Sequence, residues 1–111
     1  MPEPIEFDEL RSSPTAVQFE GGKYGSQASF FITSHPPGSG PELHRHPYEE
    51  TFIVQGGIAE FTVDEERIRA HAGQIVVVPA GAAHRFENVG DGQLDQVSIH
   101  PAAEMATEWL S

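Results

Sequence analysis

The sequence contains no cysteine, so no disulfide can stabilise it, and stability must come from packing, from a bound metal or from association between chains. This absence is compatible with a reducing cytoplasm. No apolar run approaches the roughly 20 residues that a transmembrane helix requires. The acidic, proline-containing N-terminus has neither the basic nor the apolar region of a secretory signal. We therefore expect a cytoplasmic protein that does not enter the membrane.

Basic residues are also scarce, because six Lys and Arg oppose seventeen Asp and Glu, for a formal net charge of −11. Such a surface repels nucleic-acid phosphates and anionic lipids, so neither is an expected partner. The sequence has no cysteine nucleophile, no GxSxG, no P-loop and no dinucleotide fingerprint. Lys23, the single lysine, lies in a glycine-rich turn, which makes Schiff-base chemistry improbable.

What the sequence does contain is the pattern of one small all-β domain over 1–111. Short runs of Val, Ile, Phe and Thr alternate with eleven glycines and nine prolines, as in a sandwich or barrel. After an irregular lead-in over 1–14, with at most a helical turn at 7–11, the barrel is expected over 15–100. Strands are predicted at 15–20, 28–34, 50–55, 58–63, 67–70, 75–78, 84–88 and 94–100.

Three local patterns carry further expectations about this fold. Gly56-Gly57 between two strand patterns predicts a β-hairpin. The continuous apolar run at 75–78 predicts a strand buried on both faces. Residues 101–111 begin with Pro101 and are rich in Ala, Glu, Met and Leu, which predicts a short C-terminal helix.

His44 and His46 are two residues apart, so on an extended strand both imidazoles face the same way. Glu50 has the same parity and adds a carboxylate to that face. Two histidines and a carboxylate suit octahedral Fe(II), Mn, Co or Ni, and they also suit tetrahedral Zn. The same HxH pair can be two solvated surface histidines, and Glu49 competes with Glu50 for the carboxylate role, although the spacing favours Glu50.

The residues around this pair resemble two motifs of the cupin superfamily. The first reads Gly38-x5-His44-x-His46-x3-Glu50-x6-Gly57, and the second reads Gly73-x5-Pro79-x-Gly81-x2-His84-x3-Asn88; every fixed position is matched. The resemblance implies a double-stranded β-helix, or jelly-roll barrel. It implies that His84 joins His44, His46 and Glu50 in holding a divalent transition metal (Fe, Mn, Ni, Co or Zn). It also implies a homodimer, to which the C-terminal segment with Trp109 could contribute.

A pocket above the metal is expected to be apolar. Phe52 and Val54 follow Glu50 at even spacing, Phe86 shares the parity of His84, and the preceding strand offers Phe30 or Ile32. These side chains indicate a partly hydrophobic small-molecule ligand, but inward aromatics also fill any small barrel.

The other residues of interest are given simpler roles. Asn88 is either structural or a hydrogen-bonding residue near the site. His35, His71 and His100 lie in a loop, near a turn and at a strand end, so each is predicted to face solvent.

Two classes of function follow. The first is a small metal-dependent enzyme, most simply a dioxygenase-like oxidoreductase, in which Glu50 is both a ligand and a proton acceptor once displaced. Isomerases and cyclases occur in the superfamily as well. The second is a non-catalytic cupin that binds or senses a small ligand or a metal. Fold resemblance cannot choose between these classes.

Overall fold

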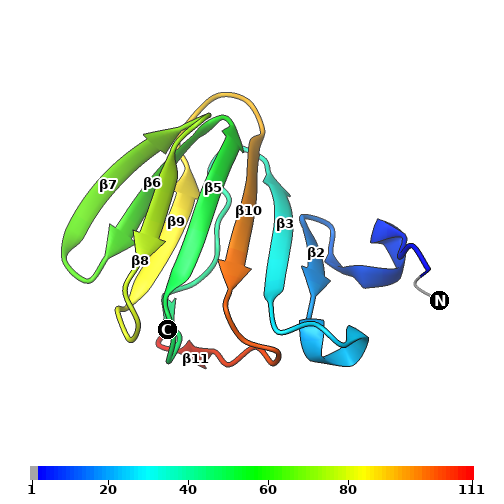
Figure 1. Cartoon of the computed structure of the whole chain (residues 1–111). Coiled ribbons are helices and arrows are strands. Elements are labelled where there is room, and N and C mark those ends of the chain that lie inside the picture. Colours follow the sequence, from blue (N-terminus) through cyan, green and yellow to red (C-terminus); the bar gives the residue numbers. More distant parts are fainter. Residues whose placement is uncertain (1–2) are drawn as a thin grey trace.

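The computed structural model describes residues 3–111, which form two antiparallel β-sheets that face each other (Figure 1). The strands are β1 (Arg11–Ser13), β2 (Ala16–Phe19), β3 (Ser29–His35), β4 (His44–Arg45), β5 (Glu50–Gly56), β6 (Ile58–Val63), β7 (Glu66–His71), β8 (Ile75–Val78), β9 (His84–Asn88), β10 (Leu94–His100) and β11 (Glu108–Trp109). Two short 3-10 turns, η1 (Phe7–Leu10) and η2 (Gly21–Tyr24), flank β1 and β2. Residues 1–2 of the predicted lead-in lie outside the described residues.

The six-stranded sheet has the order β1-β2-β3-β10-β5-β8, and the five-stranded sheet has the order β11-β4-β9-β6-β7. This arrangement confirms the predicted all-β cupin architecture. The core lies between the sheets, because successive side chains of a strand point to opposite faces and the apolar ones are driven inward. Its largest fully buried apolar side chains are Phe52, Phe61 and Leu94. Within 3–111, no helix is long and apolar enough to cross a membrane.

The predicted hairpin at Gly56-Gly57 is wrong. β5 pairs with β10 and β8, whereas β6 pairs with β7 and β9, so the two glycines carry the chain from one sheet to the other. Gly57 has φ 85°, and a Cβ added there would lie 2.5 Å from the carbonyl oxygen of Gln93. A glycine is needed because the crossing requires both a left-handed backbone and a close approach to another strand.

The prediction that residues 75–78 are buried on both faces is also wrong. Val76 and Val78 point into the core, but Ile75 is 64% exposed and Val77 is 59% exposed. β8 is an edge strand of the six-stranded sheet, and no second layer covers its outer face among the described residues. A run of four apolar residues therefore alternates between core and surface here.

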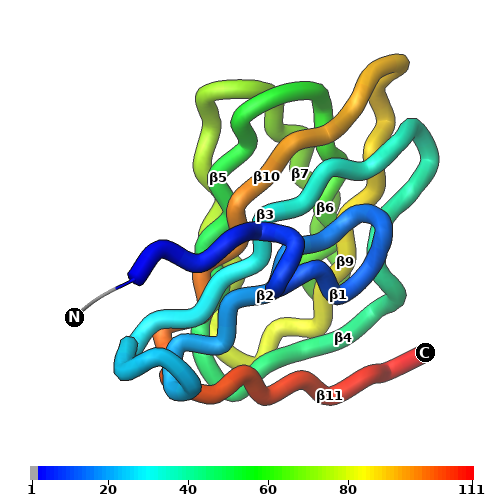
Figure 2. Tube along the Cα trace, turned by 90° about the vertical axis from the view of Figure 1, so that its right-hand side faces the viewer, coloured from blue at the N-terminus to red at the C-terminus, as the bar shows by residue number. Residues whose placement is uncertain are grey.

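The predicted C-terminal helix is not formed. Residues 101–111 contain bends at 102–104 and the short strand β11, which pairs antiparallel with β4, with Glu108 opposite Arg45 and Trp109 opposite His44 (Figure 2). Arg45 and Glu108 add an ion pair, with 2.6 Å between Nη2 and Oε2. Helix propensity is a weak preference, and it is outweighed here because the edge of β4 supplies backbone hydrogen-bond partners.

Candidate metal centre

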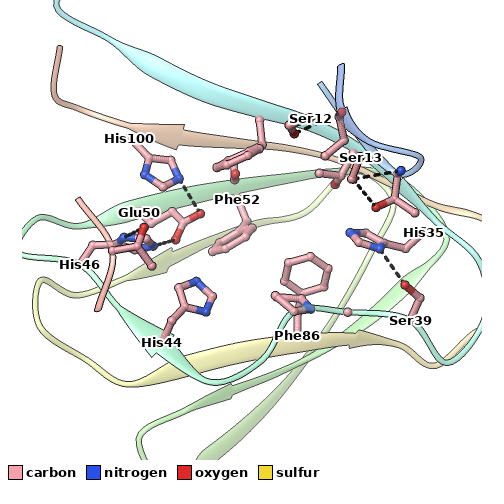
Figure 3. A pocket seen from close by; sticks show the side chains of 18 of the residues that line it. Ser12, Ser13, His35, Ser39, His44, His46, Glu50, Phe52, Phe86 and His100 are labelled. Atoms are coloured by element: carbon pink, nitrogen blue, oxygen red, sulfur yellow. Dashed lines mark hydrogen bonds and ion pairs between the residues drawn. The ribbon is translucent and has the colours of Figure 1, made fainter. Parts of the chain in front are cut away.

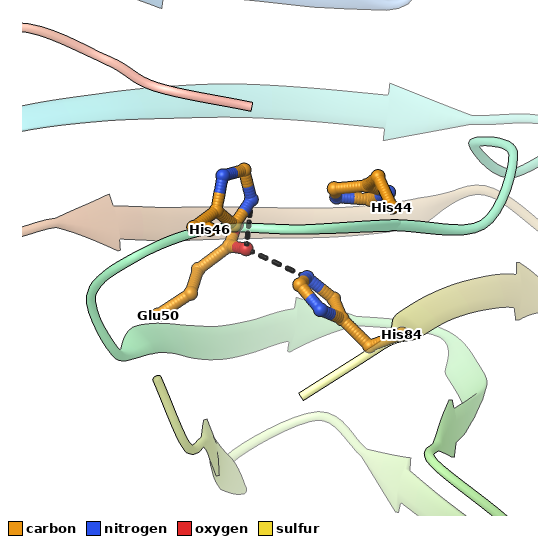
Figure 4. A group of neighbouring side chains, drawn as sticks. All are labelled: His44, His46, Glu50 and His84. Atoms are coloured by element: carbon orange, nitrogen blue, oxygen red, sulfur yellow. Dashed lines mark hydrogen bonds and ion pairs between the residues drawn. The ribbon is translucent and has the colours of Figure 1, made fainter. Parts of the chain in front are cut away.

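Four side chains from three strands and one loop meet inside the sandwich (Figure 4). His44 lies on β4, His46 follows it, and Glu50 and His84 begin β5 and β9. One donor atom from each residue lies within 4.8 Å of all the others, and all four residues are buried. Strand pairing explains part of this geometry, because His44 and His84 are direct cross-strand partners.

The Nδ1 atoms of the three histidines are each committed to a backbone carbonyl. The distances are 2.7 Å from His44 to Glu42, 2.8 Å from His46 to Ala106 and 2.9 Å from His84 to Ala82. A carbonyl oxygen only accepts, so each Nδ1 carries a proton, and whenever the ring is neutral its Nε2 presents a lone pair. This is the arrangement by which proteins orient metal-ligating histidines.

The Nε2 atoms converge on the Glu50 carboxylate. Oε1 lies 2.9 Å from His84 Nε2 and 3.0 Å from His46 Nε2. Only the His84 contact has hydrogen-bond geometry, and His46 Nε2 is buried without a hydrogen-bond partner. A nitrogen lone pair that faces a buried carboxylate oxygen repels it, so each of these contacts needs either a proton or a metal cation between the two atoms. Three imidazoles and one carboxylate therefore fit a divalent transition metal.

The charge states of these residues agree with a metal-binding role. Burial raises the pKa of the Glu50 carboxyl, but His100, His46 and His84 outweigh burial and hold that pKa well below its usual range. Burial lowers the pKa of His44. Burial also opposes protonation of His46, but Glu50 and the Ala106 carbonyl outweigh it and raise the pKa of that imidazole. A proton and a metal therefore compete for His46.

His100 is a fourth histidine at this site, and the prediction that it faces solvent is wrong. It is 1% exposed, and its Nε2 lies 3.1 Å from Glu50 Oε2, although this contact is not aligned as a hydrogen bond. His100 ends β10 on the same inward face as Leu94, Gln96 and Ser98. That even spacing from Leu94 is the sequence signal that could have placed it inside.

Tyr48 is placed to give His100 the opposite tautomer from His44, His46 and His84. The Tyr48 hydroxyl oxygen accepts the Ala106 N–H at 3.2 Å, and the hydroxyl lies 2.6 Å from His100 Nδ1. The hydroxyl is therefore placed to donate to Nδ1, which leaves the His100 proton on Nε2, facing Glu50. His100 thus turns an Nε2–H toward the carboxylate without a hydrogen bond aligned between them, whereas the neutral rings of His44, His46 and His84 turn Nε2 lone pairs toward the centre.

The centre opens into a cavity of about 480 Å³ (Figure 3). Four aromatic side chains line it: Phe31, Phe52, Phe86 and Trp109. Of the predicted pocket residues, Phe52 and Phe86 are in place, whereas Val54 is buried in the core and does not line the cavity. Phe30 and Ile32 do not line it either, because they occupy the face of β3 opposite Phe31, where Phe30 stacks on Phe19.

Some of the remaining sequence predictions are confirmed and one is wrong. Glu50 is buried and Glu49 is exposed, as the spacing favoured. His71 is exposed as predicted. The prediction that His35 faces solvent is wrong: His35 is buried, because it ends β3 on the inward face. Asn88 has a structural role: its amide donates to the carbonyls of His35 and Gly92 at 2.9 and 2.7 Å, and so joins β3, β9 and the turn before β10.

A family model described as Cupin domain matches residues 31–100. The chain belongs to the cupin family. Among curated relatives, "Polyketide synthase CurC" of Streptomyces cyaneus is 39% identical over 62 residues, which are 55% of this cupin and 40% of that protein. "Protein SchB" of Streptomyces halstedii is 38% identical over 56 residues, which are 50% of this cupin and 41% of that protein. The chain thus matches less than half the length of these relatives.

Solved structures show the same fold. Oxalate decarboxylase from Bacillus subtilis at pH 4.6 superposes with a TM-score of 0.78 and 27% identity, covering 98% of this cupin and 30% of that chain. A formate complex of oxalate decarboxylase from Lactobacillus farciminis gives a TM-score of 0.85 at 22% identity, covering 99% of this cupin and 37% of that chain. At that identity, the second likeness shows the fold alone.

Proposed function

We propose that this cupin is a small metal-dependent oxidoreductase of the dioxygenase type that acts on a small, partly hydrophobic organic substrate. The observation that carries the proposal is the convergence of three Nε2 lone pairs and the Glu50 carboxylate at the wall of an aromatic cavity. When bound there, a divalent transition metal supplies Lewis acidity and, for iron or manganese, redox chemistry with dioxygen.

The protein's own residues have separable roles in this proposal. His44, His46, His84 and Glu50 hold the metal, and Phe52 and Phe86 exclude water from the space beside it. Glu50 is the single carboxylate among the described residues that line the cavity. Its Oε2 atom faces His100, and we assign to that atom the acceptance of a proton from a substrate hydroxyl.

The size and charge of the cavity support an aromatic substrate over a very small anion. About 480 Å³ lies within the range of pockets that enclose drug-sized ligands. Its described lining contains no Lys or Arg, so a dianion such as oxalate would find no cationic side chain there. The similarity to "Polyketide synthase CurC" also supports a polyketide-derived substrate.

The test is metal content followed by oxygen uptake. Protein made without a histidine tag is loaded in turn with Fe(II), Mn(II), Ni(II), Co(II) and Zn(II), and its oxygen consumption is followed with flavonols and enediols. We expect one metal per chain and turnover with a redox-active metal. His84→Ala should lose both, whereas the exposed-histidine control His71→Ala should keep both.

Two results would redirect the proposal. A tightly held metal with no turnover of any substrate in the panel would favour a non-catalytic cupin that binds or senses a ligand or metal. Product formation without oxygen uptake would favour a metal-dependent isomerase or cyclase.

A further inference from the structure

A polar pair, the buried His35 and the partly buried Ser39, lies at the end of the cavity away from the metal centre. His35 and Ser39 occupy this end, with Phe52 and Phe86 between them and Glu50 (Figure 3). His35 is 8% exposed, its Nδ1 lies 2.9 Å from the Ser39 hydroxyl, and its ring packs edge-on against Phe86 with 5.3 Å between centroids. The sequence predicted that His35 faces solvent. The function proposed above assigns no role to His35 or to Ser39.

The pair is held rigidly by its surroundings. Asn88 donates its amide to the His35 carbonyl at 2.9 Å. The loop that carries Ser39 is hydrogen-bonded to β9 twice, from Gly38 N to Asn88 O at 2.9 Å and from Asn88 N to Ser39 O at 3.0 Å. Gly40 packs so closely on β9 that an added Cβ would lie 1.9 Å from the Phe86 carbonyl oxygen. Side chains fixed in this way are preorganised for binding.

One ring nitrogen of the pair remains available. Ser39 engages Nδ1, and no hydrogen bond within residues 3–111 involves His35 Nε2. The nearby hydroxyls of Ser12 and Ser13 already have partners, in the Ala16 carbonyl and the Thr15 hydroxyl. Burial lowers the pKa of His35, so the ring is neutral near pH 7 and offers one uncharged hydrogen bond.

We propose that His35 and Ser39 form a second binding subsite, which takes a hydroxyl or carbonyl group at the far end of a planar, neutral molecule whose near end binds at the metal centre. The proposal rests on the function proposed above and adds the substrate class. The aromatic walls between the two ends match a planar ring system, and the lack of Lys and Arg in the described lining matches a neutral one.

The test compares two probes that differ by one hydroxyl. Flavonol carries the metal-chelating hydroxyl and carbonyl but no hydroxyl on its outer ring, and its para-hydroxyl derivative adds one there. Binding to the Zn(II)-loaded protein is measured by calorimetry. One buried hydrogen bond predicts that the derivative binds about 3- to 10-fold more tightly. In labelled protein, the His35 Nε2 resonance should shift with the derivative and not with flavonol.

Variants separate the subsite from the rest of the cavity. His35→Phe keeps an aromatic ring against Phe86 and should remove the preference while leaving flavonol affinity within about 2-fold, since it deletes only the polar contact. Ser39→Ala keeps the His35 side chain, releases its tether and should reduce the preference. His71→Phe, at an exposed histidine outside the cavity, is the matched control and should keep the full preference.

The outcomes are distinguishable. Equal affinity for the two probes in the wild type, or an undiminished preference in His35→Phe, overturns the subsite and leaves the proposed function standing. If neither probe binds, both the planar, neutral substrate class and the subsite are overturned. The proposed function is then still tested separately, by metal content and by oxygen uptake with enediols. Thermal melting confirms that each variant is folded.

Discussion

At the scale of single residues, the candidate centre depends on which nitrogen of each histidine carries the proton. Backbone carbonyls place that proton on Nδ1 of His44, His46 and His84, and Tyr48 places it on Nε2 of His100. The four histidines therefore divide into three whose neutral rings turn Nε2 lone pairs toward the candidate centre and one that turns an Nε2–H toward Glu50. The division is made by neighbours that are remote in sequence, because Ala106 lies sixty positions from His46 and His100 lies fifty-two from Tyr48.

Tyr48→Phe should lower the affinity for a divalent metal by about 10-fold, because His100 then loses the hydroxyl that orients it toward Glu50. Competition with a chromophoric chelator measures this. Tyr24→Phe is the matched control, since Tyr24 is 48% exposed and stacks on Phe19. Equal affinity of the wild type and Tyr48→Phe would show that the hydroxyl does not support the site.

Stability should depend on pH through His35, whose pKa is lowered by burial. Above the ordinary histidine value of about 6.5, neither the folded nor the unfolded chain binds this proton. Below that value the unfolded chain binds it first, so the free energy of unfolding falls as the pH falls toward the folded-state pKa. Urea denaturation of the metal-free protein should therefore show a smaller loss between about pH 7.5 and 5.5 in His35→Phe than in the wild type. Parallel curves would contradict this assignment.

At the scale of the elements, strand positions were predictable and strand partners were not. The segments 58–63, 75–78, 84–88 and 94–100 form strands with the predicted bounds, because period-two alternation is a local property. The Gly56-Gly57 pair joins two sheets where a hairpin was expected, and residues 101–111 pair with β4 where a helix was expected. Both outcomes depend on which strand edge lies nearby, and local sequence does not carry that information.

Gly57→Ala should destabilise the protein more than Gly73→Ala does. Both glycines have positive φ, 85° and 90°, so each substitution carries the left-handed backbone cost of about 1–2 kcal/mol. Only at Gly57 would the added Cβ also meet backbone, at 2.5 Å from Gln93 O, whereas at Gly73 nothing lies within 4 Å. We expect a further cost of about 1 kcal/mol or more in urea unfolding. Equal costs would show that the sheet crossing tolerates the side chain.

At the scale of the whole molecule, the outer face of β8 is apolar although the chain carries a net charge of −11. Ile75 and Val77 are exposed there, beside their cross-strand partners Ile53 and Thr51 on β5. All four side chains are uncharged, so two copies of this acidic chain can meet here without bringing like charges together. We propose that this face forms the interface of the homodimer that the family resemblance implies.

Ile75→Lys combined with Val77→Lys should shift the protein from dimer to monomer, because burying two lysines opposite their own copies is unfavourable. Sedimentation velocity at micromolar concentration measures the change. Arg67→Lys, a conservative change on exposed β7, is the control and should leave the dimer intact. A monomeric wild type would refute the homodimer. The cytoplasmic location and the absence of nucleic-acid partners stay predictions from composition.

The sequence by itself determined the fold family, most strand positions, and the assembly of His44, His46, Glu50 and His84. These depend on side-chain alternation and on motif spacing, which are written along the chain. Only the tertiary structure placed His100 and His35 in the wall of the cavity, with Tyr48 hydrogen-bonded to His100, and only it paired the C-terminal segment with β4 beside the centre. The physical reason is that these contacts join residues far apart in sequence, so which groups meet is decided by how the two sheets pack.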